Sequence, residues 1–249
     1  MNALDLTILT RTDTDDAALD SAAAAVFELF LARQEEFGFG ANVTAHYPDI
    51  ANPATSAFLA DPVAYIARRI AASRDPVARV VLLTTYGERM LSPLAAAGYG
   101  DTAIVMPAGP DFSYVSMRTA DHGRTLYLEA VDETDPRMNP GFVLELRDHA
   151  GVLRGGACGS VDGDYAYLSI MALDADLPRA TGGRLARSLL DHLRREGVKI
   201  VHLGTQTAGP FYAKLGFATT HTVLPRLRTR RGADGRQVAT DLQMMELTL

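Results

Sequence analysis

Hydrophobic residues in the first half of the chain recur with two different periods. Leu4–Leu9 alternates at every second position, as a half-buried strand does, whereas apolar residues between Asp16 and Phe37 recur at helical spacing. Further along, the same two patterns predict a helix, a strand, a short helix and two more strands, at 63–73, 80–85, 91–97, 102–106 and 114–118. The stretch 124–131 fits either a strand or a short helix. These elements predict a mixed fold.

The second half begins with hairpins and continues through a longer series of elements. Strands at 142–147 and 152–160 flank a polar turn, and a second turn at Asp162-Gly163 leads into the strand Tyr165–Leu173. The remaining elements are expected as a glycine turn at 178–184, a helix at 185–195, a strand at 198–203, a short helix, and strands at 219–226 and 238–247. The expected fold class is α/β, or α+β, with a mixed, mainly antiparallel sheet flanked by helices.

Composition narrows the class of protein. The 249 residues suffice for one large domain or two small ones, and 47% hydrophobic with 22% charged residues is typical of a soluble protein. The net charge of −6 argues against a nucleic-acid partner, so the basic run 226–236 is interpreted as a solvated turn. The single cysteine, Cys158, favours a reducing compartment. Without a signal pattern or an apolar span, we expect a cytoplasmic protein with no membrane partner.

A weak internal repeat is visible in the sequence. Sliding the chain so that Gly98 falls on Gly216 also aligns Val80–Pro107 with Val198–Pro225 without a gap. Both segments are predicted as strand, short helix, Gly-aromatic pair, strand and proline. Coincidence in a chain rich in Ala and Val is the alternative, but the matched glycines and prolines favour a duplication.

The repeat predicts two tandem halves. We expect a degenerate half at 1–110 and a cofactor-binding half at 111–249, joined by the proline-rich stretch 107–110. The first copy has no Gly-Gly turn before its helix, and Leu94 stands where the second copy has Tyr212. The first half is therefore expected to have lost its chemistry.

The most specific motifs lie between Tyr165 and Phe217. Gly182-Gly183 opens a helix, where free backbone N–H groups and the positive helix end suit a phosphate; a plain helix start without a ligand is the alternative. Further on, Phe211-Tyr-Ala-Lys-Leu-Gly-Phe217 ends a short helix. Together these motifs resemble the core of the GNAT superfamily of acyl-CoA-dependent N-acyltransferases. The resemblance covers residues 114–249 well, and the first half only through the repeat.

The resemblance implies acetyl-CoA as co-substrate, bound without a metal. The strand end Met171, Ala172 and Leu173 would pair with the pantetheine arm as an added strand would. The family's glycine turn fits this chain in two registers, one starting from Thr181 and one from Arg179. The implied cofactor contacts are Arg179, Thr181, Gly182, Gly183, Arg184, Leu185 and Ala186. Thr205 stands where many relatives carry an Asn and is a weaker candidate contact.

By the same resemblance, Tyr212 would donate a proton to the departing CoA thiolate. A packing aromatic is the alternative. No carboxylate occurs between Tyr165 and Leu173, so His202 is the candidate general base, although a lone strand histidine more often belongs to the core. Further candidates are Asp164, Tyr165, Tyr167, Glu145 or a water chain. Cys158 is expected to be a small packed residue, and the histidines show no metal-ligand spacing.

These observations predict transfer of an acyl group, acetyl foremost, from coenzyme A to an amine of a small molecule. The loop Phe37–Ala54 is the candidate acceptor site, and the protein is expected to be a monomer or a homodimer. Two alternatives stay open. One is a non-catalytic GNAT-like protein that binds acyl-CoA or a metabolite, which the altered turn and the missing base favour. The other is a transferase that uses a larger acyl or aminoacyl donor.

Overall fold

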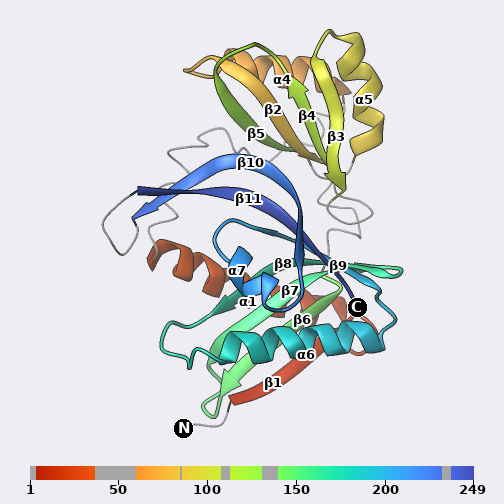
Figure 1. Cartoon of the computed structure of the whole chain (residues 1–249). Coiled ribbons are helices and arrows are strands. Elements are labelled where there is room, and N and C mark those ends of the chain that lie inside the picture. The colour runs from red at the N-terminus through yellow and green to blue at the C-terminus, as the bar shows by residue number, and fades with distance from the viewer. Residues whose placement is uncertain (1–3, 37–59, 85, 108–112, 131–139, 232–236) are drawn as a thin grey trace.

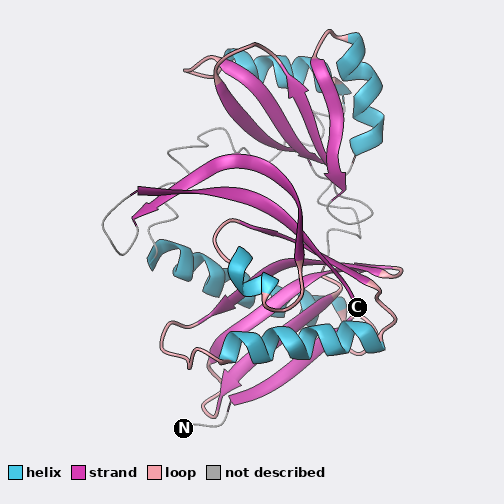
Figure 2. Cartoon of the chain, in the orientation of Figure 1, coloured by secondary structure: helices cyan, strands magenta, loops and turns pink. Residues whose placement is uncertain are grey.

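Two β-sheets form the framework of the protein. The computed structural model describes residues 4–36, 60–84, 86–107, 113–130, 140–231 and 237–249. One sheet has seven strands and the other has four (Figure 1), and helices lie against both of them (Figure 2). None of the helices in these ranges combines the length and the apolar composition that a membrane span needs. The two sheets with helices against them confirm the predicted fold, and their strand pairings are mixed and mainly antiparallel, as expected.

The seven-stranded sheet has the order β1-β6-β7-β8-β9-β11-β10. Its strands are β1 Leu4–Thr10, β6 Phe142–Asp148, β7 Leu153–Asp162, β8 Tyr165–Leu173, β9 Ile200–Thr205, β10 Ala218–Arg231 and β11 Gln237–Thr248. Neighbouring strands are antiparallel except β8 and β9, which are parallel. Both predicted hairpins, β6 with β7 and β7 with β8, are confirmed.

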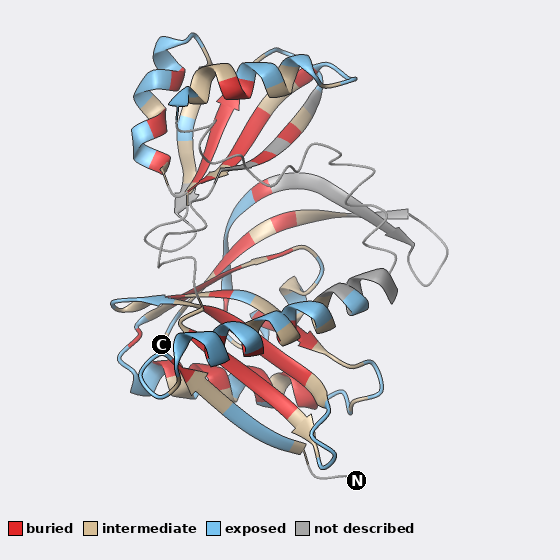
Figure 3. Ribbon diagram, turned by 180° about the vertical axis from the view of Figure 1, so that it is seen from behind, coloured by how far each residue is buried: buried red, intermediate tan, exposed pale blue. Residues whose placement is uncertain are grey.

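Two long helices cover opposite faces of this sheet. α1 (Asp16–Glu36) packs Val26 against Val143, whereas α6 (Thr181–Arg195) packs Leu189 in the cluster that contains Leu144. Adjacent residues of a strand point to opposite faces, so burial of β6 on both sides explains why every residue from Phe142 to Leu146 is buried. Buried residues concentrate in the strands between these helices (Figure 3). A short helix, α7 (Gly209–Ala213), joins the α6 side.

The four-stranded sheet has the order β3-β4-β2-β5. Its strands are β2 Val77–Thr84, β3 Gly100–Pro107, β4 Ser113–Arg118 and β5 Arg124–Ala130, and its helices are α4 Pro62–Ala71 and α5 Gly87–Ala96. Both helices pack on one face, where Ile66 and Leu94 meet Val80 and Leu82. The undecided stretch 124–131 is a strand, because it pairs in parallel with β2.

The two sheets share an arrangement around the predicted repeat. The succession α4-β2-α5-β3-β4 matches α6-β9-α7-β10-β11, and the strand orders β3-β4-β2 and β10-β11-β9 agree. In each sheet the next strand is parallel to its neighbour, since β5 lies beside β2 and β8 lies beside β9. In the chain, β5 comes after its unit, whereas β8 comes before its unit. Gly98 and Gly216 both follow the short helix with positive φ, at 86° and 100°. The topology supports the proposal of a duplicated unit.

The sheets do not follow the predicted division of the chain at residue 110. β1 pairs with β6, so the first strand belongs to the seven-stranded sheet. β4 and β5 lie after residue 110 and complete the four-stranded sheet. The prolines at 107–110 suggested a boundary, but pairing between strands far apart in the chain leaves no local trace. The described residues of 60–130 form a unit set between α1 and β6.

Apolar side chains join this unit to the β10–β11 ribbon. Val81 and Tyr114 pack with Val223, Leu242 and Met244. Because its two neighbours in β2 face the α4–α5 core, Val81 lies on the other face of the four-stranded sheet. The four-stranded unit therefore lies against the larger sheet, close to β9.

Candidate cofactor cleft and catalytic site

β8 and β9 pair as parallel strands only over their first residues. Four residue pairs join them, from Tyr165 with Ile200 to Leu168 with Leu203. Beyond this point β8 runs on to Leu173 paired with β7 alone, and β9 pairs with β11. Among the described residues, the backbone of residues 169–173 therefore has no strand partner on its β9 side, and the two strands separate after Leu168. An extended ligand can hydrogen-bond to such a backbone edge.

The corresponding strands of the four-stranded sheet do not diverge. β2 and β5 stay paired from Val77 with Arg124 to Thr84 with Ala130. Leu94, the counterpart of Tyr212, is fully buried. This part of the chain offers no equivalent opening between its parallel strands, in line with the expected loss of chemistry.

The N-terminus of α6 lies beside the diverging end of β8. The amide of Thr181 donates to the carbonyl of Pro178 at 2.8 Å, and the amide of Arg184 donates to that of Ala180 at 3.2 Å. Between them, the N–H groups of Gly182 and Gly183 have no hydrogen-bond partner among the described residues. No acidic side chain lies in the first helical turn. The positive end of the helix is therefore open to an anion.

Gly182 is the residue at which three elements meet. A Cβ at this position would lie 3.0 Å from Cδ1 of Leu173, the last residue of β8, and 3.6 Å from the ring of Phe211 in α7. At Gly183, the nearest atoms would be the guanidinium of Arg187 at 3.5 Å. A side chain at position 182 would require Leu173 to shift by a few tenths of an ångström, so glycine suits the close approach of β8 to α6.

The helix starts at Thr181, four residues earlier than its predicted start at Leu185. Leu185 and Ala186 consequently lie beyond the first turn, where amides bond within the helix, and their side chains are in the core. The structure therefore does not place these two predicted cofactor contacts at the opening. Arg179 and Arg184 are exposed, and Nη2 of Arg184 lies 3.5 Å from Oγ1 of Thr181.

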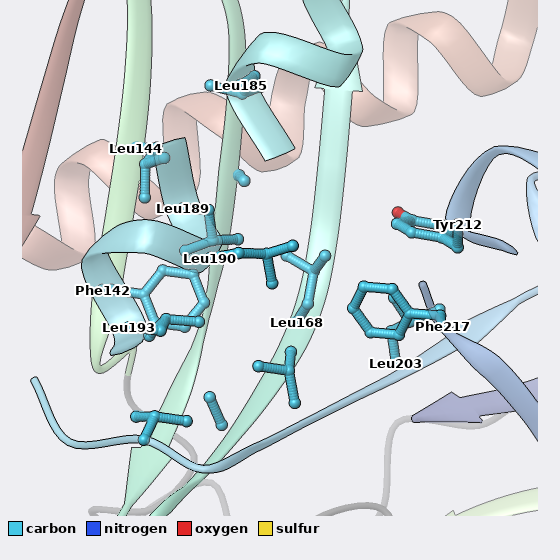
Figure 4. Close-up of a cluster of buried hydrophobic side chains, with 14 of the residues drawn as sticks. Phe142, Leu144, Leu168, Leu185, Leu189, Leu190, Leu193, Leu203, Tyr212 and Phe217 are labelled. Atoms are coloured by element: carbon cyan, nitrogen blue, oxygen red, sulfur yellow. The ribbon is translucent and has the colours of Figure 1, made fainter. Parts of the chain in front are cut away.

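Tyr212 lies where β8 and β9 separate. Its side chain is only 8% exposed and belongs to the same cluster as Leu168 and Leu203, the last pair between the two strands. Its ring makes edge contacts with Phe211 and Phe217, with centroids 5.1 and 5.6 Å apart. Figure 4 shows its hydroxyl directed toward β8. Burial, with a smaller effect of Tyr167, raises the pKa of Tyr212 to about 12, so the hydroxyl keeps its proton at neutral pH.

Thr205 holds α7 in place. Its hydroxyl accepts a hydrogen bond from the amide of Ala208 at 3.1 Å, directly before the helix. The side chain is buried at the end of β9. This bond explains a hydroxyl at this position, and it fixes the start of the helix that carries Tyr212.

His202 lies on the face of β9 opposite α6. Its neighbours Val201 and Leu203 belong to the α6 core, while its own ring stacks on Tyr165 at a centroid distance of 5.9 Å. Nδ1 is buried without a hydrogen-bond partner and lies 3.7 Å from Oε2 of Glu246. Burial lowers the pKa of His202, against the opposing effect of Glu246, so the imidazole is neutral at neutral pH. A neutral imidazole is able to accept a proton.

Two of the other candidate bases, Glu145 and Asp164, are engaged in ion pairs elsewhere. Glu145 is bonded to Arg147 at 2.6 and 3.0 Å, two strands away on β6, and Asp164 accepts from Lys199 at 2.9 Å. Cys158 is buried, and burial raises its pKa to about 11, which fits the predicted packing role. In the part of the chain that the structure describes, no cluster of His, Cys, Asp and Glu could hold a metal ion. The proposed acceptor loop, 37–54, lies outside the described residues.

One positioning residue escaped the sequence analysis. Arg154 of β7 bonds Asp174 and Asp176, with Nη2 2.6 Å from Oδ1 of Asp176, and its Nη1 lies 3.3 Å from Oδ2 of Asp148. These bonds tie the loop between β8 and α6 to the β6–β7 hairpin, and the hydrogen bonds that Arg154 donates to Asp176 and Asp174 raise its pKa. Partners twenty residues apart in the chain carry no local sequence signal.

Comparison with known proteins gives a similarity at the level of structure. No model of a known protein family matches the chain, and no curated protein matches its sequence. Among solved structures, the ribosomal-protein-S18-alanine N-acetyltransferase from Escherichia coli is 25% identical with a TM-score of 0.35, covering 43% of this chain and 67% of its own. A GNAT family acetyltransferase from Elizabethkingia anophelis with acetyl-CoA bound has 15% identity and a TM-score of 0.36, covering 43% and 76%. The PaiA N-acetyltransferase from Thermoplasma acidophilum in complex with coenzyme A has 16% identity and a TM-score of 0.32, covering 43% and 60%. Each of these similarities covers 43% of this chain, and one of the three proteins is named as a member of the GNAT family, which the motifs of this chain resemble.

Proposed function

We propose that this protein is an N-acyltransferase that moves an acyl group, acetyl foremost, from coenzyme A to an amine of a small molecule. The observation that carries the proposal is the meeting of three features at one opening. These are the unpaired end of β8, the open N-terminus of α6, and Tyr212 at the point where β8 and β9 separate. Each of the three suits a different part of an acyl-CoA molecule.

The cofactor would lie along the unpaired edge of β8. Amides of the pantetheine arm pair with the backbone near Met171, Ala172 and Leu173. The pyrophosphate accepts hydrogen bonds from the N–H groups of Gly182 and Gly183, and Arg179 adds positive charge beside it. The thioester then reaches the fork beside Tyr212.

The reaction transfers one proton and one acyl group. The amine nitrogen attacks the thioester carbonyl, and the C–S bond breaks as the tetrahedral intermediate collapses. A phenol with a pKa of about 12 is a weaker acid than a thiol, so the Tyr212 hydroxyl acts mainly as a hydrogen-bond donor to the departing sulfur. The amine loses one proton to a general base, and one proton from that base or from water restores the thiol of coenzyme A as the thiolate leaves.

His202 is proposed as the general base because it faces the side from which an acceptor can approach. It lies on the sheet face opposite α6, and the four-stranded unit packs beside that face through Tyr114 and Met244. The four-stranded unit would thus close the acceptor side of the cleft. This role explains why a part of the chain without its own chemistry is retained.

The burial of Tyr212 and His202 favours one competing function, a protein that binds acyl-CoA without turning it over. The test is release of free thiol from acetyl-CoA with a panel of small amines, repeated with longer acyl donors. Turnover of any amine supports the transferase, and the preferred donor then reports the acyl length. Tight binding of acetyl-CoA, measured by calorimetry, with no turnover of any amine or donor would support the binding protein instead.

A further inference from the structure

A cavity of about 590 Å³ lies on the side of α6 that faces β1 and β6. Leucines form much of its wall: Leu4 and Leu6 of β1, Leu146 of β6, Leu177 of the preceding loop and Leu185 of α6. Its volume falls within the range of roughly 300 to 1,000 Å³ that is typical of small-molecule sites. The side of α6 that carries Thr181, Arg184 and Ser188 completes the wall.

Polar groups are found at two places in this cavity. Thr181 and Arg184 come from the first turn of α6, beside the unpaired amides. Asp148 and Asp176 lie beside Arg154, whose guanidinium they share with a third carboxylate. No carboxylate among the described residues pairs with Arg184, so one cation remains available for a ligand, whereas the carboxylates beside Arg154 retain lone pairs for a donor.

We propose that this cavity receives the adenosine 3′-phosphate end of coenzyme A, a purine nucleoside that carries phosphate. The inference rests on the proposed function, because it places the pyrophosphate at Gly182 and Gly183, next to the cavity rim. The base lies against the leucines, its exocyclic amine donates to Asp148 or Asp176, and the 3′-phosphate pairs with Arg184. The cofactor would therefore cross the start of α6, with its thioester on one side and its nucleoside on the other.

The cavity ties the nucleoside to the loop that Arg154 holds. Asp176, Leu177 and Pro178 line the cavity and also connect β8 with α6. A ligand that fills the cavity orders the same loop from which the phosphate-binding turn begins. Affinity for the complete cofactor should therefore exceed affinity for a donor that lacks the nucleoside.

The test fills the cavity and compares two acetyl donors. Leu6→Trp and Ser188→Trp each place an indole in the cavity, and Val161→Trp is the matched control, since Val161 is 39% exposed and Leu6 38%, but Val161 does not line the cavity. We expect both fillers to raise KM for acetyl-CoA about tenfold and to leave KM for S-acetylpantetheine, and kcat for either donor, unchanged. Adenosine 3′,5′-bisphosphate should bind the wild type in calorimetry, and about tenfold more weakly to each filler.

The outcomes separate this inference from the proposed function. If acetyl-CoA is turned over and the fillers change neither its KM nor bisphosphate binding, the cavity proposal is overturned while the transferase stands. Equal increases in KM for both donors would also overturn it, because the damage would then lie in the cleft. If the fillers weaken bisphosphate binding but no amine is acetylated by the wild type, the cavity proposal stands and the transferase fails.

Discussion

Replacing Tyr212 by phenylalanine removes a single hydroxyl from the point where β8 and β9 separate. The aromatic ring keeps its edge contacts with Phe211 and Phe217, and these contacts hold α7 against the core. We therefore expect the free energy of unfolding to change by no more than about 1 kcal/mol. Binding of acetyl-CoA should stay within about threefold of the wild type, because no phosphate or pantetheine contact is altered.

The expected loss appears in kcat. Burial raises the pKa of Tyr212 from 10.0 to about 12, which disfavours ionisation by roughly 3 kcal/mol and keeps the donor proton in place at pH values well below 12. One positioned donor to a developing negative charge is worth about 10²–10³ in kcat. Tyr212→Phe should therefore lower kcat by about 10²–10³ with little change in KM.

The assay measures thiol release from acetyl-CoA with saturating amine, together with thermal melts of each variant. Tyr99→Phe is the matched control, because Tyr99 packs against the four-stranded core, far in the chain from the cleft. If Tyr212→Phe retains the kcat of the wild type while its melting temperature is unchanged, the hydroxyl takes no part in the reaction. The assignment of a donor to the departing sulfur would then be wrong.

Three further predictions concern the base, the glycine turn and the loop. Burial lowers the pKa of His202, so kcat/KM for an amine that stays unprotonated should fall only as pH drops below about 6.5. His202→Gln should lose this acidic limb of the pH profile of kcat/KM and should lower the rate by about 10². Gly182→Val should raise KM for acetyl-CoA about tenfold or more, since even a Cβ would lie 3.0 Å from Leu173. Gly183→Ala should leave KM within about threefold. An unchanged KM in both variants would contradict the proposed contact of this turn with acetyl-CoA. Arg154→Met should raise KM for acetyl-CoA by loosening the loop. The same substitution should lower the melting temperature at pH 7 but not at about pH 2. The hydrogen bond from Arg154 lowers the pKa of Asp176 in the folded protein. The stabilising effect of this bond is therefore present above the ordinary carboxyl pKa and is lost as pH falls through the lowered pKa of Asp176.

The elements whose pattern is local could be predicted closely. β8 runs over the predicted residues Tyr165–Leu173, and α1 ends within one residue of its expected end. Hydrophobic periodicity and the glycines and prolines that end an element are properties of neighbouring residues, so they can be recognised whatever the tertiary fold. The short helix with Tyr212 was likewise identified from its own motif, because the spacing of Tyr212 and Phe217 is set within one turn and one glycine.

The start of α6 shows where local reasoning fails. Gly182-Gly183 is typical of a turn, yet both glycines lie inside the helix. Glycine at position 182 is favoured by the close approach of Leu173, which comes from another element. In the sequence alone, a glycine that makes room for a tertiary contact therefore looks the same as a glycine that allows a turn conformation of the backbone.

By itself, the sequence determined the kind and order of most elements, with the stretch 124–131 undecided, and the motifs that indicate acyl-CoA chemistry. Only the tertiary structure decided that β1 joins the far sheet, that β8 and β9 separate after Leu168, and that Arg154 holds the loop before α6. The physical reason is the range of the interactions. Helical and strand periods arise between neighbours, whereas strand pairing, an ion cluster and a cavity depend on residues that meet only after the chain has folded.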